Sequence, residues 1–467
     1  MTARTLFEKI WREHAIGDAD GDTAVLAVDR IFLHERTGAI ALKSLRKRGL
    51  QVFAPGHVFC TMDHIVDTFP GRGDSTRVPS GRQFILDMRQ ETRSAGVTLF
   101  DIPDPEQGIV HVVSPELGIV QPGATVVCPD SHTCTQGALG ALAWGIGSTE
   151  AEEALATGSI EVRRPKTLRV CFYGVIPGGI TPKDMSLALL AQYGSAGGNG
   201  YVVEYSGSAV ESLDIEARLT LCNLTTEFSA MTGLIAPDDS TFRYLNGRRY
   251  APRGPQWEKA VAHWRTLRSD TDAIFDREIT MDATRLAPMI TWGTNPAQAC
   301  PITACVPQLE DSGMKREAYE RALEYMGLKP GAALVGLRID AAFIGSCTNS
   351  RLSDLRRAAR VLEGRHVAEG VRAICVPGSS EVKRQAEAEG IDRQFKMAGF
   401  EWRESGCSMC FFAGGESFGE HQRVVSSTNR NFENRQGPLT RTHLASPETV
   451  AASAVAGSLV DVRTLRH

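Results

Sequence analysis

The order of apolar and helical segments along the chain constrains its fold more than any other feature of the sequence. A buried strand is predicted over residues 341–345, and the helix predicted over residues 352–363 has leucines at helical spacing. The same order recurs with a strand over 371–376 and a helix near 382–388. Strands that alternate with helices are typical of parallel sheets with helices on both faces, so the sequence predicts an α/β fold. In such sheets, functional residues lie in loops beyond the carboxyl ends of the strands.

Earlier in the chain, a strand is predicted over residues 124–128, followed by a polar loop. A helix of small residues is predicted from about residue 137 to residue 158. The chain of 467 residues is long enough for two or three domains. Candidate domain boundaries lie near residues 163–166 and within residues 276–292.

The charge balance and the apolar segments limit the partners that the chain can have. It carries 51 basic and 55 acidic residues, and its net charge of −4 does not favour a nucleic-acid or membrane surface. No apolar run reaches the ~20 residues that span a bilayer, and residues 1–10 lack the apolar core of a signal peptide. The 11 cysteines are scattered and odd in number, unlike a secreted disulfide framework. We therefore expect a cytoplasmic protein without nucleic-acid or membrane partners.

Three cysteines form the strongest constellation in the sequence. Cys347 follows a predicted strand and precedes a helix, whose N-terminus favours a thiolate or an anionic group. Cys407 and Cys410 form a Cys-x-x-Cys pair, a spacing that lets two sulfurs bind one metal centre. A [4Fe–4S] cluster held by three cysteines would leave one iron open as a Lewis acid.

The spacing of these cysteines alone leaves other interpretations open. A Cys-x-x-Cys pair can be a redox site, although the usual placement near an N-terminal strand is missing. In a structural zinc site the protein usually supplies all four ligands, and the sequence has no second Cys-x-x-Cys pair to complete such a set. Any one of the three can also be a buried structural cysteine, which is what we expect of most of the other eight.

Carboxylates and histidines offer candidates for acid–base chemistry. Asp130 and His132 come after the strand over 124–128, and a carboxylate beside an imidazole can orient a base or hold a water molecule. Asp63 and His64 form a second such pair. His111 is a lone imidazole. Asn223 and Glu227 are four positions apart and would share one face of a helix, but their spacing alone does not make them catalytic. Each histidine, taken singly, is more often a hydrogen-bonded structural residue.

The run from Asn429 to Arg435 is the most unusual polar segment. It contains Arg430 and Arg435, five positions apart and surrounded by amides. Arginine binds a carboxylate through two parallel hydrogen bonds, a geometry that lysine cannot provide. The segment therefore predicts an anion-binding site, with a surface turn held by ordinary ion pairs as the alternative.

Four segments together resemble the aconitase superfamily. Residues 344–350 and 406–410 are similar to its two cluster-ligand motifs, and residues 427–432 are similar to its substrate-binding motif. Residues 130–133 are similar to a further signature of the superfamily. The resemblance extends almost from end to end of the chain.

Other segments resemble one branch of the superfamily, the bacterial large subunits that isomerise isopropylmalate in leucine biosynthesis. These segments are residues 61–64, 108–111, 197–200 and 291–296. The resemblance implies a hydro-lyase that interconverts 2-isopropylmalate and 3-isopropylmalate by dehydration and rehydration, without net redox change.

The resemblance also implies a fold of three α/β/α lobes around one [4Fe–4S] cluster per subunit. The approximate lobes are residues 1–164, 165–284 and 285–467. The implied cluster ligands are Cys347, Cys407 and Cys410. Catalytic roles are implied for Asp63, His64, His111, Asp130, His132 and Glu227. Substrate binding is implied for Asn223, Asn429, Arg430 and Arg435.

One part of the family's machinery is expected on another chain. In single-chain aconitases, a further mobile domain supplies a catalytic serine base and another arginine. The present sequence ends at His467, soon after the last motif, so the resemblance implies a separate small subunit that carries this swivelling domain. We expect the chain to be inactive without that subunit.

Three positions differ from the pattern of this branch. Pro129 stands where glycine is expected, residues 411–414 read Phe-Phe-Ala-Gly in place of Leu-Ala-Met-Asn, and Asn434 replaces a glycine. Asparagine tolerates left-handed backbone better than most residues. The alternative function is therefore that of a paralogue acting on a methylmalate, a dimethylmalate or homoaconitate.

Two other classes of protein remain to be weighed. The first is an RNA-binding relative that has lost the cluster, and the near-neutral net charge and the retained cysteines argue against it. The second is an electron-transfer iron–sulfur protein, and the lack of a fourth suitable cysteine near the pair argues against that.

Overall fold

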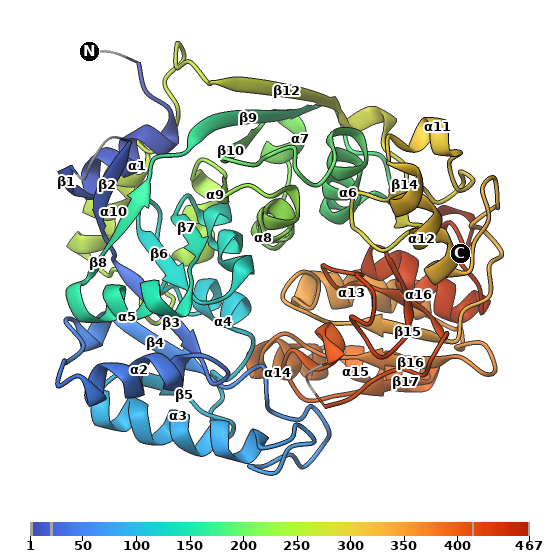
Figure 1. Ribbon diagram of the computed structural model, residues 1–467, viewed down its shortest axis with the longest axis horizontal. Coiled ribbons are helices and arrows are strands. Elements are labelled where there is room, and N and C mark those ends of the chain that lie inside the picture. The colour runs from blue at the N-terminus through green and yellow to red at the C-terminus, as the bar shows by residue number, and fades with distance from the viewer. Residues whose placement is uncertain (1–2, 19–21, 413–414, 466–467) are drawn as a thin grey trace. The chain divides into compact units, whose positions relative to one another are not determined.

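The computed structural model describes residues 3–18, 22–412 and 415–465, and it has two compact units (Figure 1). The first unit comprises the described parts of Met1–Ile65, Ser80–Val175 and Gly198–Asp282. The second unit comprises Val66–Pro79, Ile176–Gly197 and the described parts of Ala283–His467. Strands alternate with helices in both units and most sheets are parallel, so the predicted α/β fold is confirmed.

The first unit contains a five-stranded sheet in which all neighbouring strands are parallel. In spatial order its strands are β5 (Thr98–Phe100), β4 (Val58–Thr61), β3 (Arg30–His34), β6 (Thr125–Cys128) and β7 (Leu142–Gly145). Every residue of β4 and β6 is buried, as expected for apolar strands in a sheet covered on both faces. The neighbouring helices are α2 (Gly38–Lys47), α3 (Gly81–Ala95), α4 (Val110–Glu116) and α5 (Ser148–Thr157). Helix α2 packs against both α3 and α5.

A second parallel sheet of the first unit includes its longest strand, β9, which runs along the top of Figure 1. The order is β11 (Thr232–Leu234), β10 (Tyr201–Ser206), β9 (Lys166–Tyr173) and β12 (Arg277–Asp282). A three-stranded antiparallel sheet is formed by β1 (Ala15–Asp18), β2 (Thr23–Ala27) and β8 (Ser159–Arg163). The helices of this part are α1 (Leu6–His14), α7 (Ser208–Glu211), α8 (Ile215–Asn223), α9 (Asp239–Leu245) and α10 (Pro255–Trp264). The 3₁₀ helices are η1 (Pro55–His57), η2 (Ser131–Leu139) and η3 (Leu224–Phe228).

The second unit is built around another five-stranded parallel sheet. Its strands are β17 (Phe400–Trp402), β16 (Arg372–Cys375), β15 (Ala341–Ile344), β18 (Arg423–Ser426) and β19 (Arg441–Leu444). Its larger helices are α6 (Pro182–Tyr193), α12 (Arg316–Met326), α13 (Leu352–Leu362), α14 (Ser380–Ala388), α15 (Ile391–Ala398) and α16 (Pro447–Ala456). Smaller elements are the hairpin β13 (Met289–Thr291) and β14 (Ala299–Pro301), α11 (Leu309–Ser312), η4 (Ala283–Arg285), η5 (Ser408–Cys410) and η7 (Val462–Thr464).

The apolar core of this sheet includes a residue from the loop that carries Cys407 and Cys410. Phe343, Ile374 and Val424 come from the three central strands, and they pack with Met409, one of the two residues between Cys407 and Cys410. All four side chains are fully buried, so the loop that carries the pair is anchored in the core.

Most predicted elements agree with the structure, and one does not. The strands predicted over 341–345 and 371–376 are β15 and β16, and the helices predicted after them are α13 and α14. The long helix predicted over 137–158 is wrong, because η2, β7 and α5 occupy this segment. The proposed lobe boundaries near residues 164 and 284 stay a prediction. Among the described residues, no helix is both long and apolar enough to cross a membrane.

Candidate functional site

The acidic and histidine candidates of the first unit come together at the carboxyl ends of three neighbouring strands. His34 ends β3, Asp63 and His64 follow β4, and Asp130 and His132 follow β6. Because β3 lies between β4 and β6 in a parallel sheet, these residues share one edge of it. The acid–histidine cluster is defined here as His34, Glu35, Asp63, His64, His111, Asp130, His132 and Glu227.

Asp130 contacts three histidines of this cluster. Its Oδ1 lies 3.0 Å from Nε2 of His111 and accepts a hydrogen bond of 2.8 Å from the backbone N–H of His132. Its Oδ2 lies 3.3 Å from Nε2 of His64. Burial by itself would raise the pKa of Asp130, but the hydrogen bonds and charges of these histidines, led by His111, hold it well below its usual value. The carboxylate therefore stays ionised and orients the imidazoles around it.

Two further carboxylates complete the cluster. Oδ1 of Asp63 lies 2.6 Å from Nδ1 of His64, so the two nitrogens of this imidazole face two different carboxylates. Burial would raise the pKa of Asp63, but the charge and hydrogen bond of His64 lower it. Oε1 of Glu227 lies 3.0 Å from Nε2 of His132. The six predicted catalytic residues thus form one connected network.

Sequence reasoning missed His34 and Glu35. The carboxylate of Glu35 is fully buried and accepts backbone hydrogen bonds from Asp63 (3.0 Å), His64 (2.7 Å) and Ile65 (2.5 Å). The ring of His34 stacks on that of His64, with centroids 4.0 Å apart. Burial raises the pKa of Glu35 to about 7 and lowers that of His34 to about 4. Their sequence signal was a His-Glu pair directly after an apolar run.

Four members of the cluster also have the spacing of metal ligands. Ligand atoms of His34, Glu35, Asp63 and His64 all lie within 4.8 Å of one another. The Glu35 oxygens already accept three backbone hydrogen bonds, and those of Asp63 contact His64 and the backbone N–H of Val110. We therefore interpret the group as a hydrogen-bonded network that fixes His64.

Two buried amides hold η2, the element that carries His132. Asn223, at the end of α8, is fully buried and donates a hydrogen bond of 2.8 Å to Oγ1 of Thr135. Gln136 was not singled out in the sequence analysis. Its Nε2 lies 3.4 Å from Nδ1 of His111. Its Oε1 is buried and has no hydrogen-bond partner within the described part of the chain. A role of Asn223 in substrate binding stays a prediction.

The three predicted cluster cysteines lie at the carboxyl ends of strands in the second unit's sheet. Cys347 follows the central strand β15, and Cys407 and Cys410 follow β17. Asn429 follows β18, which lies next to β15 in the sheet. All three cysteines are buried. The cysteine site is defined here as Ser346, Cys347, Cys407, Cys410, Asn429, Arg430 and Arg435.

Polar groups contact the sulfurs of Cys347 and Cys410. Nδ2 of Asn429 lies 3.4 Å from Sγ of Cys347, and its Oδ1 lies 3.9 Å from Sγ of Cys410. Oγ of Ser346 lies 3.2 Å, and Nη2 of Arg435 lies 3.6 Å, from the same Cys410 sulfur. N–H donors and a guanidinium charge stabilise anionic sulfur. The donor set therefore fits an iron–sulfur cluster bound by thiolates.

The backbone beside these cysteines adopts a conformation that is rare for residues other than glycine. Ser346 has φ 79° and Ser408 has φ 47°. Such residues cost on the order of 1–3 kcal/mol each and are concentrated at functional sites. Asn434, which replaces a glycine of the branch, also has a positive φ of 65°. This replacement therefore keeps the backbone shape that the glycine would allow.

The two arginines of the cysteine site are half-buried. Nε of Arg435 is buried, and within the described residues it has no hydrogen-bond partner. The guanidinium carbon of Arg435 lies 5.4 Å from the ring centre of Phe411 and 5.1 Å from that of Phe432. A buried N–H without a partner is a donor for an anion. Ala413 and Gly414, two of the residues that differ from the branch pattern, lie outside the described residues.

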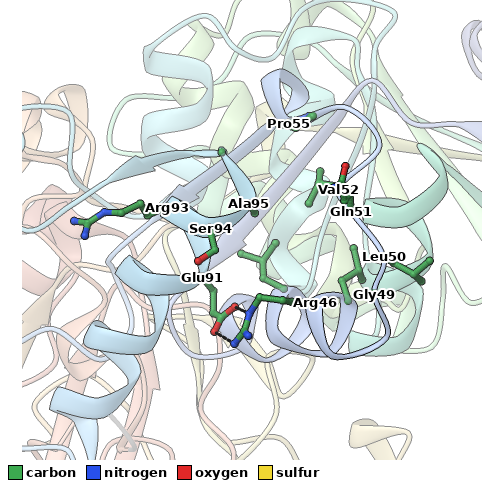
Figure 2. Close-up of a pocket in the computed structure, with 13 residues that line it drawn as sticks. Arg46, Gly49, Leu50, Gln51, Val52, Pro55, Glu91, Arg93, Ser94 and Ala95 are labelled. Atoms are coloured by element: carbon green, nitrogen blue, oxygen red, sulfur yellow. Dashed lines mark hydrogen bonds and ion pairs between the residues drawn. The ribbon is translucent and has the colours of Figure 1, made fainter.

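A pocket of about 540 Å³ is lined by the ends of α2 and α3 and by residues between Gly49 and Pro55. Figure 2 shows the residues that line it. Arg46 and Glu91 face each other there through hydrogen bonds of 2.9 and 2.8 Å. None of the predicted site residues lines this pocket. We assign it no role in the chemistry discussed below.

Comparisons with known proteins identify the family of the chain. The model of the aconitase family (aconitate hydratase) matches residues 8–457. The 3-isopropylmalate dehydratase large subunit 1 of Bradyrhizobium diazoefficiens is 55% identical over 466 residues, which cover 99% of this chain and 97% of that protein. The crystal structure of aconitase X of Thermococcus kodakaraensis in its holo form covers 88% of both chains at 13% identity, with a TM-score of 0.46, a likeness too slight to support an argument. The family predicted from the motifs is confirmed: this chain belongs to the aconitase family.

Proposed function

We propose that the chain is the large subunit of a 3-isopropylmalate dehydratase, which interconverts 2-isopropylmalate and 3-isopropylmalate by loss and re-addition of water. One observation carries the proposal: the guanidinium of Arg435, with a buried Nε that no described residue contacts by a hydrogen bond, lies 3.6 Å from the sulfur of Cys410. A dicarboxylate substrate that binds next to an iron–sulfur cluster requires such an anion-binding group beside a thiolate. The name of the relative with 55% identity supports the choice of substrate.

Cys347, Cys407 and Cys410 are the proposed ligands of one [4Fe–4S] cluster per subunit. An iron–sulfur cluster is the expected cofactor of the family, and its [4Fe–4S] form is part of the proposal. When bound, the cluster supplies an iron without a protein ligand that can act as a Lewis acid. Ser346 and Asn429 hold the thiolates through the sulfur contacts described above.

Arg430 and Arg435 are the proposed clamps for the substrate carboxylates. Each guanidinium can donate two parallel hydrogen bonds to one carboxylate. The rings of Phe411 and Phe432 flank Arg435 and restrict its movement. With its carboxylates fixed, the dehydrated intermediate can take up water again at the neighbouring carbon.

The acid–histidine cluster is the proposed proton network of the same reaction. Asp130 stays ionised and therefore keeps His64 and His111 oriented. His64, placed between Asp63 and Asp130, can deliver the proton that the departing hydroxyl needs and take it back on rehydration. Glu227 orients His132 in the same way.

A separate small subunit is the proposed source of the base that removes the proton from the neighbouring carbon. The words "large subunit" in the name of the relative imply such a partner for that protein. We place the swivelling domain, with its serine and a further arginine, on this partner.

A second substrate stays a candidate because of Phe411 and Phe412. They stand where the branch has the smaller residues leucine and alanine, and Phe411 packs beside the guanidinium of Arg435. A change this close to the carboxylate clamp can alter which substituent of the malate is accepted. The second candidate function is therefore the same reaction on a methylmalate, a dimethylmalate or homoaconitate.

The ligand assignment is tested with Cys407→Ser after anaerobic purification. The wild-type chain should hold about four irons, and the variant should lose the cluster spectrum. Cys375→Ser is a matched control, because Cys375 is also buried at the end of a strand in the same sheet, where burial raises its pKa and keeps it a neutral thiol. A full cluster in Cys407→Ser, or loss of the cluster in Cys375→Ser, would contradict the assignment.

The substrate is tested by co-expression with the candidate small subunit and anaerobic reconstitution. Turnover is then measured on a panel of 2- and 3-isopropylmalate, methylmalates, dimethylmalate and homoaconitate. The proposal requires the highest kcat/KM for the isopropylmalates. Preference for another member of the panel would establish the second candidate, and no turnover on any of them would reject both.

A further inference from the structure

Lys183 is a fully buried cation that neither of the two sites described above includes. It is the second residue of α6, and its side chain is 0% exposed. Its ammonium donates a hydrogen bond of 2.6 Å to the backbone carbonyl of Ser427 and a second one to that of Thr428. These carbonyls directly precede Asn429 and Arg430 of the cysteine site.

The position of Lys183 is unfavourable for α6 itself. Burial removes the hydration of an ammonium group, and a positive charge in the first turn of a helix opposes the helix dipole. Asp184, the next residue, does not offset this charge by a direct contact, because its carboxylate accepts hydrogen bonds from Thr181 and from the backbone N–H of Met289. The stability of the helix therefore does not explain a lysine here.

The negative charges that act on Lys183 come partly from the cysteine site. Burial lowers the pKa of Lys183 to about 7, and Asp184, Asp354, Cys347 and Cys410 act in the opposite direction. A thiolate-bound cluster would add negative charge on the same side. The ammonium would then be held in its charged form, and it would in turn favour the anionic sulfur.

We propose that Lys183 is a positioning residue that sets the backbone of Ser427 and Thr428 for the anion-binding segment and supplies a buried positive charge to the cysteine site. The inference rests on the proposed cluster. It predicts two separate effects of losing the ammonium. The reduction potential of the cluster falls, because a nearby positive charge favours the reduced and more negative form. Substrate affinity falls, because Asn429 and Arg430 lose their fixed position.

The test uses Lys183→Met, which keeps the length of the side chain but removes the charge and all donors. Variant and wild type are reconstituted anaerobically with the small subunit. The reduction potential is followed by electron paramagnetic resonance during a redox titration, and the dissociation constant of 3-isopropylmalate is measured from the spectral change on binding. We expect a lower potential and a dissociation constant raised about ten- to a hundredfold, as for loss of hydrogen bonds from a charged group.

Two further variants separate positioning from a general effect on folding. Lys329→Met removes an exposed lysine of the same unit and should leave both quantities unchanged. Lys183→Arg keeps the charge and should keep the potential near that of the wild type, while the dissociation constant rises. If Lys183→Met does not fold, Lys183→Gln serves as the neutral variant, with the same fall in potential expected.

The outcomes distinguish this inference from the proposed function. A wild-type protein without any cluster would reject the proposed function, and the inference would fall with it. A wild-type cluster together with an unchanged potential and an unchanged dissociation constant in the neutral variant would reject the inference alone. If neither neutral variant folds, Lys183 is a residue of core stability and the inference is wrong.

Discussion

Arg435 is held by two phenyl rings and a sulfur, with no carboxylate among its described contacts. Other arginines of the described chain form ion pairs with Asp or Glu, and most of these pairs are on the surface. Surface ion pairs contribute little to the stability of the fold. Because no described carboxylate pairs with the guanidinium of Arg435 and its buried Nε has no described partner, it can also donate to a substrate anion. These contacts support the proposal that residues 429–435 bind an anion, which stays a prediction.

Arg435→Lys should lose most activity without changing the cluster. Lysine cannot make the two parallel hydrogen bonds to a carboxylate, and losing one charged hydrogen bond should cost about 2–4 kcal/mol. That is roughly a thirty- to thousand-fold loss in kcat/KM. Iron content, spectrum and turnover are measured on one preparation.

Arg321→Lys is the matched control for this substitution. Arg321 is 75% exposed and pairs with Glu433 of the same segment at 2.8 Å, so a lysine there should change kcat/KM by less than about twofold. Near-normal efficiency of Arg435→Lys would mean that this arginine does not bind the substrate.

At the scale of elements, the carboxyl ends of parallel strands explain why sequence reasoning found much of the candidate site. Cys347, Asp63 and Asp130 each follow a short apolar run, and such runs place their next residues at one edge of a sheet. The motifs therefore identified residues that the structure brings together within each unit. The strand β7 was missed because Leu-Ala-Trp-Gly has no β-branched residue and its small residues also suit a helix.

For Lys183 and Glu35, no signal in the sequence names the groups they contact. The contact of Lys183 with Ser427 joins positions 244 residues apart, and neither residue belongs to a periodic pattern that points to the other. Glu35 accepts hydrogen bonds from the backbone N–H groups of Asp63 and His64. Because every residue except proline has a backbone N–H, the sequence does not indicate which residues make such contacts. Sequence reasoning can thus name the groups that do chemistry more readily than those that hold them.

The contact between β19 and β13 predicts a pH-dependent stability. His443 is fully buried, Nδ1 lies 2.6 Å from the carbonyl of Thr291, and Nε2 lies 2.8 Å from a guanidinium nitrogen of Arg423. Burial, with the charge of Arg423, lowers the pKa of His443 from 6.5 to about 3. Between those values the unfolded chain binds a proton that the folded chain does not, so this contribution to stability is complete above pH 6.5 and is lost as the pH falls toward 3.

His443→Gln should weaken this pH dependence. An amide can donate to the carbonyl and accept from the arginine but does not titrate, so the variant should lose a slope of up to about 1.4 kcal/mol per pH unit. Thermal unfolding midpoints between pH 4.5 and 7 provide the comparison. His366→Gln, at an exposed histidine, should keep the wild-type slope. Equal slopes for His443→Gln and the wild type would show that His443 does not contribute.

At the scale of the whole molecule, each of the two units contains one of the two candidate sites described above. The second unit supplies the proposed cluster ligands and carboxylate clamps, and the first supplies the proposed proton network. Neither set includes the base that the proposed function assigns to a small subunit. Cluster binding and turnover should therefore be separable properties of this chain.

The purified chain alone should bind iron and sulfide but should not interconvert the isopropylmalates. Addition of the small subunit should restore turnover in proportion to the complex formed, because the missing base arrives with it. Titration of one subunit into the other, with turnover and complex formation followed together, measures this. Robust turnover by the chain alone would contradict the proposal that the base comes from a separate small subunit.

The contacts of Asp130 also have a consequence for how this sequence can change over time. One carboxylate lies 3.3 Å from the imidazole of His64, 3.0 Å from that of His111 and 3.6 Å from that of His132. A mutation at any one of these positions leaves the others facing a partner that no longer suits them. We expect natural relatives either to retain all four residues or to replace all four together. The residues around the substrate, in contrast, can change one at a time during evolution.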